Sequence, residues 1–335
     1  MSDRIESVVR LISRLSVILP AYNEEEALSK TACTVSRILE RARIPYELIF
    51  VDDGSLDNTW IEIEKLCETD AHIIGVHFSR NFGKEAAVYA GLAQSTGSAA
   101  AVMDCDLQHP PEVLPDMYRL WQQGYEVIEG VKSSRGQENL LHRHGAGLFY
   151  RIMTKATGVD MQNTSDFKLL DRKAVDAILS MPERSLFFRA ASAWVGFRST
   201  TVSFQVQERV AGKSKWSPWS LTKYAFTNIV SFTTMPLQFV SFAGAACFVL
   251  SLLLLLYSLI QYFSGHAVEG YTTILTVLLF IGSAIMMSLG IIGYYIARIY
   301  EEVKHRPRYL ISKITGVQRT SWESESRDGK DNEKK

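Results

Sequence analysis

Two long stretches without charged side chains dominate the C-terminal third of this 335-residue chain. No acidic or basic residue occurs within residues 224–268, and none occurs within residues 270–297. A helix needs roughly 20 apolar residues to cross a bilayer, and each stretch contains a longer apolar run than that. We therefore expect two transmembrane helices, at about residues 237–263 and 272–296, in a membrane region that covers residues 236–300.

Basic residues flank these two uncharged stretches. They are Arg209, Lys213, Lys215 and Lys223 before the first stretch, and Arg298, Lys304, Arg306 and Arg308 after the second. The connecting segment SGHAVEG contains neither lysine nor arginine. Because basic flanks stay on the cytoplasmic side, we expect a multi-pass protein of the inner (plasma) membrane with both termini in the cytoplasm. The two predicted spans contain no charged residue that could form a transport site, so we expect the hairpin to serve as a membrane anchor.

The N-terminal two thirds of the chain have a different composition. The opening MSDRIESVVR is charged and lacks the apolar core of a secretory signal, so we expect the first two hundred residues in the cytoplasm. A formal net charge of zero gives no indication of a nucleic-acid partner. We expect an N-terminal segment 1–13, a cytoplasmic domain 14–210, an interfacial amphipathic segment 211–235, the membrane region, and a cytoplasmic tail 301–335.

Short apolar runs alternate with helix-like segments through the cytoplasmic domain. The strand candidates are residues 15–20 (LSVILP), 46–51 (YELIFV), 72–78 (HIIGVHF) and 99–103 (AAAVM). Strands that alternate with helices at this spacing predict βαβ units and a parallel sheet covered by helices on both faces. Ligands of such sheets bind beyond the carboxyl ends of the strands, where the polar motifs of this chain lie.

Two aspartates follow the last of these strands, in the sequence MDCDLQHPPE. Asp104 and Asp106 share one face if the strand continues between them, and Cys105 then points into the core. A second acidic strand end, Asp52 and Asp53, is expected nearby. Converging carboxylates suit Mg²⁺ or Mn²⁺, which could hold a diphosphate and stabilise it as it leaves. The simpler alternative is that these aspartates cap turns and helices.

Other phosphate-binding motifs fail on their spacing. No G-x-G-x-x-G follows a predicted strand, so a dinucleotide oxidoreductase is not supported. The GKS at residues 212–214 resembles the end of a P-loop, but Gln207 occupies the position of the required earlier glycine. A P-loop ATPase is therefore not supported either.

Six segments, in order, carry a resemblance to a known family. VILPAYNEEE, VDDGSLDNT, SRNFGKEAA and MDCDLQHPPE look like glycosyltransferase family 2, which has a GT-A fold. TSDFKLLDR, RVAGKSKW and the apolar hairpin resemble the membrane-anchored polyprenyl-phosphate glycosyltransferases, such as bactoprenol glucosyltransferases and dolichol-phosphate mannose synthases. The resemblance implies an α/β fold: a GT-A (Rossmann-like) nucleotide-sugar domain followed by a C-terminal two-helix transmembrane hairpin. Cys105 departs from the family, which usually has a small residue there.

The resemblance also implies roles for individual residues. The residues expected to bind the nucleotide sugar are Pro20, Ala21, Tyr22, Glu24, Asp52, Asp53, Lys84, Asp104 and Gln108. Asp104 and Asp106 would hold Mg²⁺ or Mn²⁺ against the diphosphate. The residues expected to be catalytic are Asp166 and Asp106. Asp166 lies in SDF, at a position often described as the base.

The expected acceptor limits what Asp166 has to do. A phosphate monoester has a second pKa near ~6 and is already mostly dianionic at neutral pH. We therefore expect Asp166 mainly to position hydroxyl groups, with base catalysis secondary. Arg209, Lys215 and Arg189 would receive the acceptor phosphate, although basic residues before a membrane segment can also simply meet anionic lipid head groups.

Together with the residues above, the resemblance implies an inverting glycosyltransferase. Its bacterial members favour transfer of glucose from UDP-glucose to undecaprenyl phosphate at the cytoplasmic membrane face, and GDP-mannose and UDP-N-acetylhexosamines stay open as donors. A polysaccharide synthase is one rival, although Q-x-x-R-W and further spans are absent from the sequence. A non-catalytic nucleotide-sugar-binding membrane scaffold is the other, and the intact Asp104 and Asp106 oppose it. The expected partners are the nucleotide sugar, the lipid acceptor and the membrane, with a homo-oligomer left open.

Overall fold

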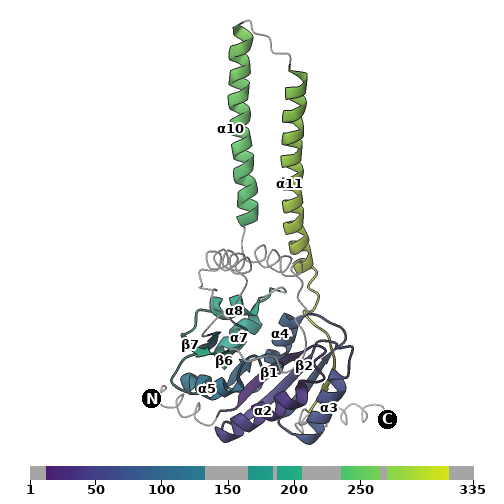
Figure 1. The fold of residues 1–335 in the computed structure, drawn as a ribbon, viewed down its shortest axis with the longest axis vertical. Helices are drawn as coiled ribbons and strands as arrows, with labels where there is room; N and C mark the ends of the chain where they lie inside the picture. Colours follow the sequence, from purple (N-terminus) through teal and green to yellow (C-terminus); the bar gives the residue numbers. More distant parts are fainter. Residues whose placement is uncertain (1–12, 133–164, 184–186, 206–234, 265–269, 317–335) are drawn as a thin grey trace, which may run out of the picture. The chain divides into compact units, whose positions relative to one another are not determined.

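The computed structural model of the chain describes residues 13–132, 165–183, 187–205, 235–264 and 270–316. The contacts divide the chain into two compact units. The first unit contains the sheet and includes the chain from residue 307 onward, and the second contains the two long apolar helices. Figure 1 shows both units, with labels on most of the helices and on some of the strands.

The first unit is built on one sheet of eight strands, in the order β7-β5-β6-β4-β1-β2-β3-β8. The strands are β1 (Leu15–Ala21), β2 (Tyr46–Asp52), β3 (Ile73–Phe78), β4 (Ala99–Val102), β5 (Val127–Lys132), β6 (Lys168–Asp171), β7 (Ser199–Phe204) and β8 (Ile311–Thr315). The four strands predicted from apolar runs are β1 to β4, and all four are confirmed, in parallel pairs. The sheet as a whole is mixed, because β6 runs antiparallel to β4 and β5, and β8 runs antiparallel to β3; neither of these two strands was predicted.

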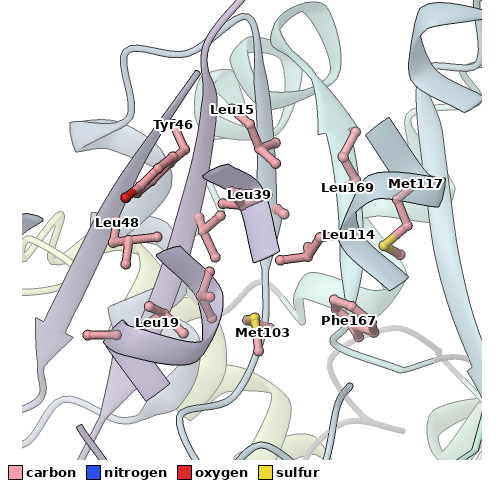
Figure 2. Packing of buried hydrophobic residues seen from close by; sticks show 14 of the residues in the cluster. Leu15, Leu19, Leu39, Tyr46, Leu48, Met103, Leu114, Met117, Phe167 and Leu169 are labelled. Atoms are coloured by element: carbon pink, nitrogen blue, oxygen red, sulfur yellow. The ribbon is translucent and has the colours of Figure 1, made fainter. Parts of the chain in front are cut away.

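Helices cover both faces of this sheet, as its apolar pattern predicts. The helices of the first unit are α2 (Leu28–Arg41), α3 (Thr59–Thr69), α4 (Lys84–Gln94), α5 (Leu114–Gln122), α7 (Arg172–Ser180) and α8 (Phe188–Trp194), with the 3₁₀ turn η1 (Pro111–Val113). Successive β1 residues point to opposite faces. Val17 joins the core under α2, α3 and α5, while Ile18 joins the core under α4, α7 and α8. Figure 2 shows the first of these cores, in which Leu39 and Leu114 pack beside strand residues.

The last strand, β8, returns to the sheet from the far end of the chain. It pairs with β3, whose other edge pairs with β2. Tyr309 stacks on Phe78 at 5.1 Å between ring centroids, with the rings 9° from parallel. Arg308 donates hydrogen bonds to the carbonyl oxygens of Met181 and Glu183. The sequence analysis did not anticipate this strand, since it placed these residues in a tail.

The second unit contains α10 (Met235–Phe263) and α11 (Tyr271–Val303), which contact each other. They fall where the two uncharged stretches predict helices. Within the described residues, one helical stretch, Phe280–Val303, is long and apolar enough to cross a membrane. The crossing of a membrane by both helices, and the orientation of the chain, stay predictions.

Candidate active site

Three side chains from separate parts of the first unit meet at the carboxyl ends of the central strands. Asp104 follows β4, Lys84 is the first residue of α4, and Asp166 lies two residues before β6. The Lys84 ammonium lies 2.6 Å from Asp104 Oδ1 and 2.8 Å from Asp166 Oδ2. A single lysine therefore bridges two carboxylates that lie 62 positions apart in the sequence.

Arg189, on α8, adds a second cation to Asp166. Its Nε donates to Asp166 Oδ1 at 2.6 Å, and its Nη2 donates to Oδ2 at 3.0 Å. This two-pronged pairing fixes the plane of the carboxylate as well as its position. Sequence analysis predicted Arg189 as a ligand of the acceptor phosphate. The structure places it on Asp166, and its role toward an acceptor stays a prediction.

The charges of this cluster set its protonation. Burial would raise the pKa of Asp166, but Lys84 and Arg189 outweigh burial and hold that pKa well below its usual value. Burial likewise opposes ionisation of Asp104, and Lys84 still lowers the Asp104 pKa. The two carboxylates in turn raise the pKa of Lys84 against the effect of burial. All three groups are therefore charged at neutral pH.

Glu85 is a fourth acid at the edge of the cluster, and the sequence analysis did not single it out. Its carboxylate accepts a hydrogen bond of 2.9 Å from the backbone N–H of Phe188. Burial, reinforced by the negative charge of Asp166, raises the pKa of Glu85 to about 7. This group therefore changes its charge within the physiological pH range, next to groups that do not.

Asp53 positions the backbone that carries Lys84. Its two carboxylate oxygens accept hydrogen bonds from the N–H groups of Phe82, at 2.6 Å, and Gly83, at 2.9 Å. Gly83 has a φ of +99°, a conformation that costs glycine little and other residues much more. The end of β2 thus fixes the start of α4, from which the Lys84 side chain reaches the two aspartates.

Asp166 is held from the other side by contacts with β5. Ser165 donates from its N–H to Glu129 and from its hydroxyl to the carbonyl of Gly130. Glu129 also pairs with the buried Lys168, whose ammonium lies 3.2 Å from Glu129 Oε1. Burial lowers the pKa of Lys168, although Glu129 opposes that change. This pair links the two strands next to the cluster and so fixes the segment that contains Asp166.

The segment between Asp104 and Asp106 differs from the expectation. β4 ends at Val102, and the chain turns through residues 105–107, with Leu107 at a φ of +57°. The argument that both aspartates share one face of a strand is therefore wrong, because no strand continues between them. Asp106 Oδ1 accepts from the N–H of Gln108 at 3.0 Å, while the Cys105 side chain is buried in the core, as expected.

The predicted nucleotide residues lie around the ends of β1 and β2. Pro20 and Ala21 are on β1, and Tyr22 and Glu24 lie in the loop that follows. The N–H of Glu24 donates to the Thr59 hydroxyl, which ties this loop to the start of α3. Their roles toward a nucleotide stay predictions.

Asp52 is engaged within the protein. One of its oxygens accepts from the N–H and the hydroxyl of Ser55, and the other lies 2.7 Å from His77 Nδ1. The His77 ring also stacks on Trp60, at 4.8 Å between centroids. These contacts give Asp52 a local role in the turn after β2. Its predicted contact with a nucleotide would have to be made beside them.

The donor set suits a magnesium or manganese ion that also binds a ligand. No group of three or more His, Cys, Asp or Glu side chains converges on one point in the described part of the chain. Mg²⁺ is usually held by one or two carboxylates together with water and phosphate oxygens, and Asp104 and Asp106 can supply that share. The ammonium of Lys84 beside Asp104 shows that this position favours a cation. The residues therefore fit the expected ion.

Two predicted acceptor ligands, Arg209 and Lys215, lie outside the described residues. Their roles stay predictions. The interfacial segment 211–235 lies largely outside the described residues as well.

Comparison with known proteins identifies the family. The pattern of the family described as Glycosyl transferase family 2 matches residues 16–179. A prophage bactoprenol glucosyl transferase homolog of Escherichia coli is 36% identical over 90% of this chain and 99% of its own length. A bactoprenol glucosyl transferase of Shigella phage SfX is 38% identical over 89% of this chain and 98% of its own.

A crystal structure of glucosyl-3-phosphoglycerate synthase from Mycobacterium tuberculosis, in complex with Mn²⁺, UDP-glucose and phosphoglyceric acid, is a more distant match. It aligns with 68% of this chain and 81% of its own, at 16% identity and a TM-score of 0.48. The sequence relatives settle the family without it, and the GT-A-like sheet agrees with them. The chain belongs to glycosyltransferase family 2.

Proposed function

We propose that this protein is an inverting glycosyltransferase that transfers glucose from UDP-glucose to undecaprenyl phosphate at the cytoplasmic face of a membrane. Relatives at 36–38% identity, aligned over nearly their whole length, are named bactoprenol glucosyl transferases, which supports both the sugar and the lipid. The observation that carries the proposal is the cluster of Asp104, Lys84 and Asp166 at the strand ends, where ligands of α/β sheets bind.

The reaction exchanges one bond at the anomeric carbon of the sugar. An oxygen of the lipid phosphate attacks this carbon, and the bond from the carbon to the diphosphate breaks on the opposite side. The products are a polyprenyl-phosphate sugar of inverted configuration and a nucleoside diphosphate. A Mg²⁺ or Mn²⁺ ion held by Asp104 and Asp106 would supply charge stabilisation of the leaving diphosphate.

The protein's own residues have three tasks in this scheme. Lys84 donates to the departing phosphate oxygens from its place at the start of α4. Asp166 stays ionised, because Arg189 pairs with both of its oxygens, and positions hydroxyl groups of the sugar. Arg209 and Lys215 neutralise the incoming phosphate, which otherwise approaches a site rich in carboxylates.

The apolar helices account for the location of the reaction. A long isoprenoid chain does not leave the bilayer, so the catalytic unit has to be held at the membrane surface. α10 and α11 have the length and composition expected of a two-helix anchor, and among the described residues the stretch Phe280–Val303 is long and apolar enough to cross a membrane. We propose that both helices cross the membrane and leave both termini in the cytoplasm.

The test is a screen of nucleotide sugars with the purified full-length protein, a short polyprenyl phosphate and Mg²⁺. We expect radiolabel from UDP-glucose to enter the organic-extractable lipid, with one nucleoside diphosphate released per sugar. Asp106→Asn and chelation should each abolish transfer, while Asp116→Asn, a change on the exposed surface of α5, should not. Labelled polymer in place of lipid, or transfer from GDP-mannose alone, would contradict the assignment.

A further inference from the structure

Lys84 occupies the position of a cation between two carboxylates, Asp104 and Asp166, which the antiparallel pairing of β4 with β6 places opposite each other. Its ammonium lies within 2.8 Å of both Asp104, which follows β4, and Asp166, which precedes β6. Two carboxylates this close to the same ammonium are also close to each other, and they repel unless a positive charge lies between them. Strand pairing brings the two carboxylates together, and the ammonium of Lys84 offsets their repulsion.

A divalent cation and this ammonium compete for Asp104. The ammonium already takes Oδ1, and a second cation on the same carboxylate would lie close to the first and be repelled by it. The side chain of Lys84 is 43% exposed, so it can swing away without opening the core. Binding of the metal to Asp104 is thus expected to require departure of Lys84.

The two aspartates differ in what they keep when Lys84 leaves. Asp166 retains both hydrogen bonds from Arg189, so its charge stays balanced. The lysine contact at Asp104 has to be replaced by another cation. His109 Nδ1 lies 4.0 Å from Asp104 Oδ2, but it accepts a hydrogen bond from the Asp104 N–H and so offers that oxygen no proton. Removal of Lys84 therefore creates a demand for positive charge at Asp104 and not at Asp166.

A diphosphate supplies a reason for Lys84 to leave. Its oxygens carry negative charge and accept hydrogen bonds from an ammonium as a carboxylate does. Asp53 holds the start of α4 through Phe82 and Gly83, so the side chain of Lys84 can turn while its backbone stays fixed. The lysine can thus exchange a carboxylate for a phosphate partner without any change in the fold.

We propose that Lys84 is a stand-in cation that keeps the donor-free site from binding a divalent metal tightly, and that the nucleoside diphosphate releases this block. The proposal rests on the function proposed above and specifies its order: metal and donor enter together, each raising the affinity for the other. Lys84 then serves two states, as the partner of Asp104 and Asp166 before binding and of the diphosphate afterwards. It is a positioning and gating residue for the metal as well as a ligand of the donor.

The test measures Mn²⁺ binding to the detergent-solubilised full-length protein, by the loss of the free-ion signal in electron paramagnetic resonance. Wild type should bind Mn²⁺ weakly alone and at least roughly tenfold more tightly with UDP. Lys84→Met should bind Mn²⁺ roughly tenfold more tightly than wild type without any nucleotide, and gain less from UDP. Lys84→Gln provides a second neutral variant, and Lys84→Arg, which keeps the charge, should keep the weak Mn²⁺ binding. Lys65→Met, on the surface of α3, should bind Mn²⁺ as the wild type does.

A further variant locates the extra metal. The tighter binding of Lys84→Met should disappear when Asp104→Asn is added, because the gain depends on that carboxylate. The inference is overturned if neither neutral variant binds Mn²⁺ more tightly than wild type without nucleotide, or if the gain survives Asp104→Asn. The nucleotide-free comparison stands even if UDP fails to bind, so a wrong donor in the proposed function can be told apart from a wrong role for Lys84.

Discussion

The pH dependence of transfer separates two roles for Asp166, base or positioning group. Lys84 and Arg189 both contact its oxygens at 3.0 Å or less and hold its pKa well below the usual 3.8. Asp166 is therefore ionised throughout the range from about pH 5 to pH 8 and cannot produce a pH limb there. The acceptor phosphate, with a second pKa near ~6, can.

We therefore expect the kcat/KM for the lipid acceptor to fall about tenfold per pH unit below pH ~6. Asp166→Asn should lower kcat/KM by roughly 10- to 100-fold, because the neutral amide no longer fixes Arg189 through a paired charge. The midpoint of the acidic limb should not move in this variant. A phosphonate acceptor, whose second pKa is higher than that of the phosphate ester, should move the midpoint upward in the wild type.

Glu85 is the necessary control, because its pKa of about 7 lies close to that of the acceptor. Glu85→Gln should leave the acidic limb in place while altering any second inflection near neutral pH. Initial rates with radiolabelled donor, taken at saturating metal and fixed ionic strength, give the profiles. The positioning role is refuted if the acidic limb vanishes or its midpoint shifts in Asp166→Asn, or if the midpoint stays the same when the phosphonate replaces the phosphate acceptor.

Three further predictions concern stability. The raised pKa of Glu85 means that its contribution to folding is fully present below pH ~4.5 and is lost as pH rises through about 7. Between pH 5 and 8 the free energy of unfolding of the wild type should therefore fall by about 1–3 kcal/mol relative to that of Glu85→Gln. Thermal midpoints of the two proteins that run parallel at all pH values would contradict this. Tyr309→Ala should speed amide exchange of β8 about 30- to 160-fold, from loss of roughly 2–3 kcal/mol of packing, while the half-exposed Leu310→Ala should change it little. Equal exchange in both variants would count against the docking of this segment. Gly91→Ala should destabilise the first unit by about 1–3 kcal/mol, because a Cβ there overlaps the Ile18 side chain, and an unchanged thermal midpoint would show that the two can separate at no cost.

The sequence was most informative where a local pattern determines the structure. The apolar runs of β1 to β4 are almost wholly buried, so their composition alone identifies them as central strands. The acidic residues after β2 and β4 follow from the same pattern, since the carboxyl ends of parallel strands share one edge. These rules placed Asp53 and Asp104 in the right region, and family resemblance added Lys84 and Asp166.

The sequence was least informative where distant segments decide the structure. β8 reads ISKIT, a short alternating run with no partner nearby, and its pairing with β3 joins residues more than 230 positions apart. The pairing of Arg189 with Asp166 likewise depends on where α8 packs, which no spacing rule predicts. Asp104 and Asp106 were expected on a strand because the apolar run suggested one, but the positive φ of Leu107 belongs to a turn.

The return of the chain to β3 affects how the protein can be shortened. The apolar helices lie between β7 and β8 in the sequence, so they are an insertion within the catalytic unit and not an appendage to it. A truncation before α10 would delete β8 and leave β3 as an exposed edge strand, whose unpaired backbone groups can pair with other molecules. A water-soluble version should therefore fail as a simple deletion and succeed only when residues 307–316 are supplied again, by fusion or as a separate peptide.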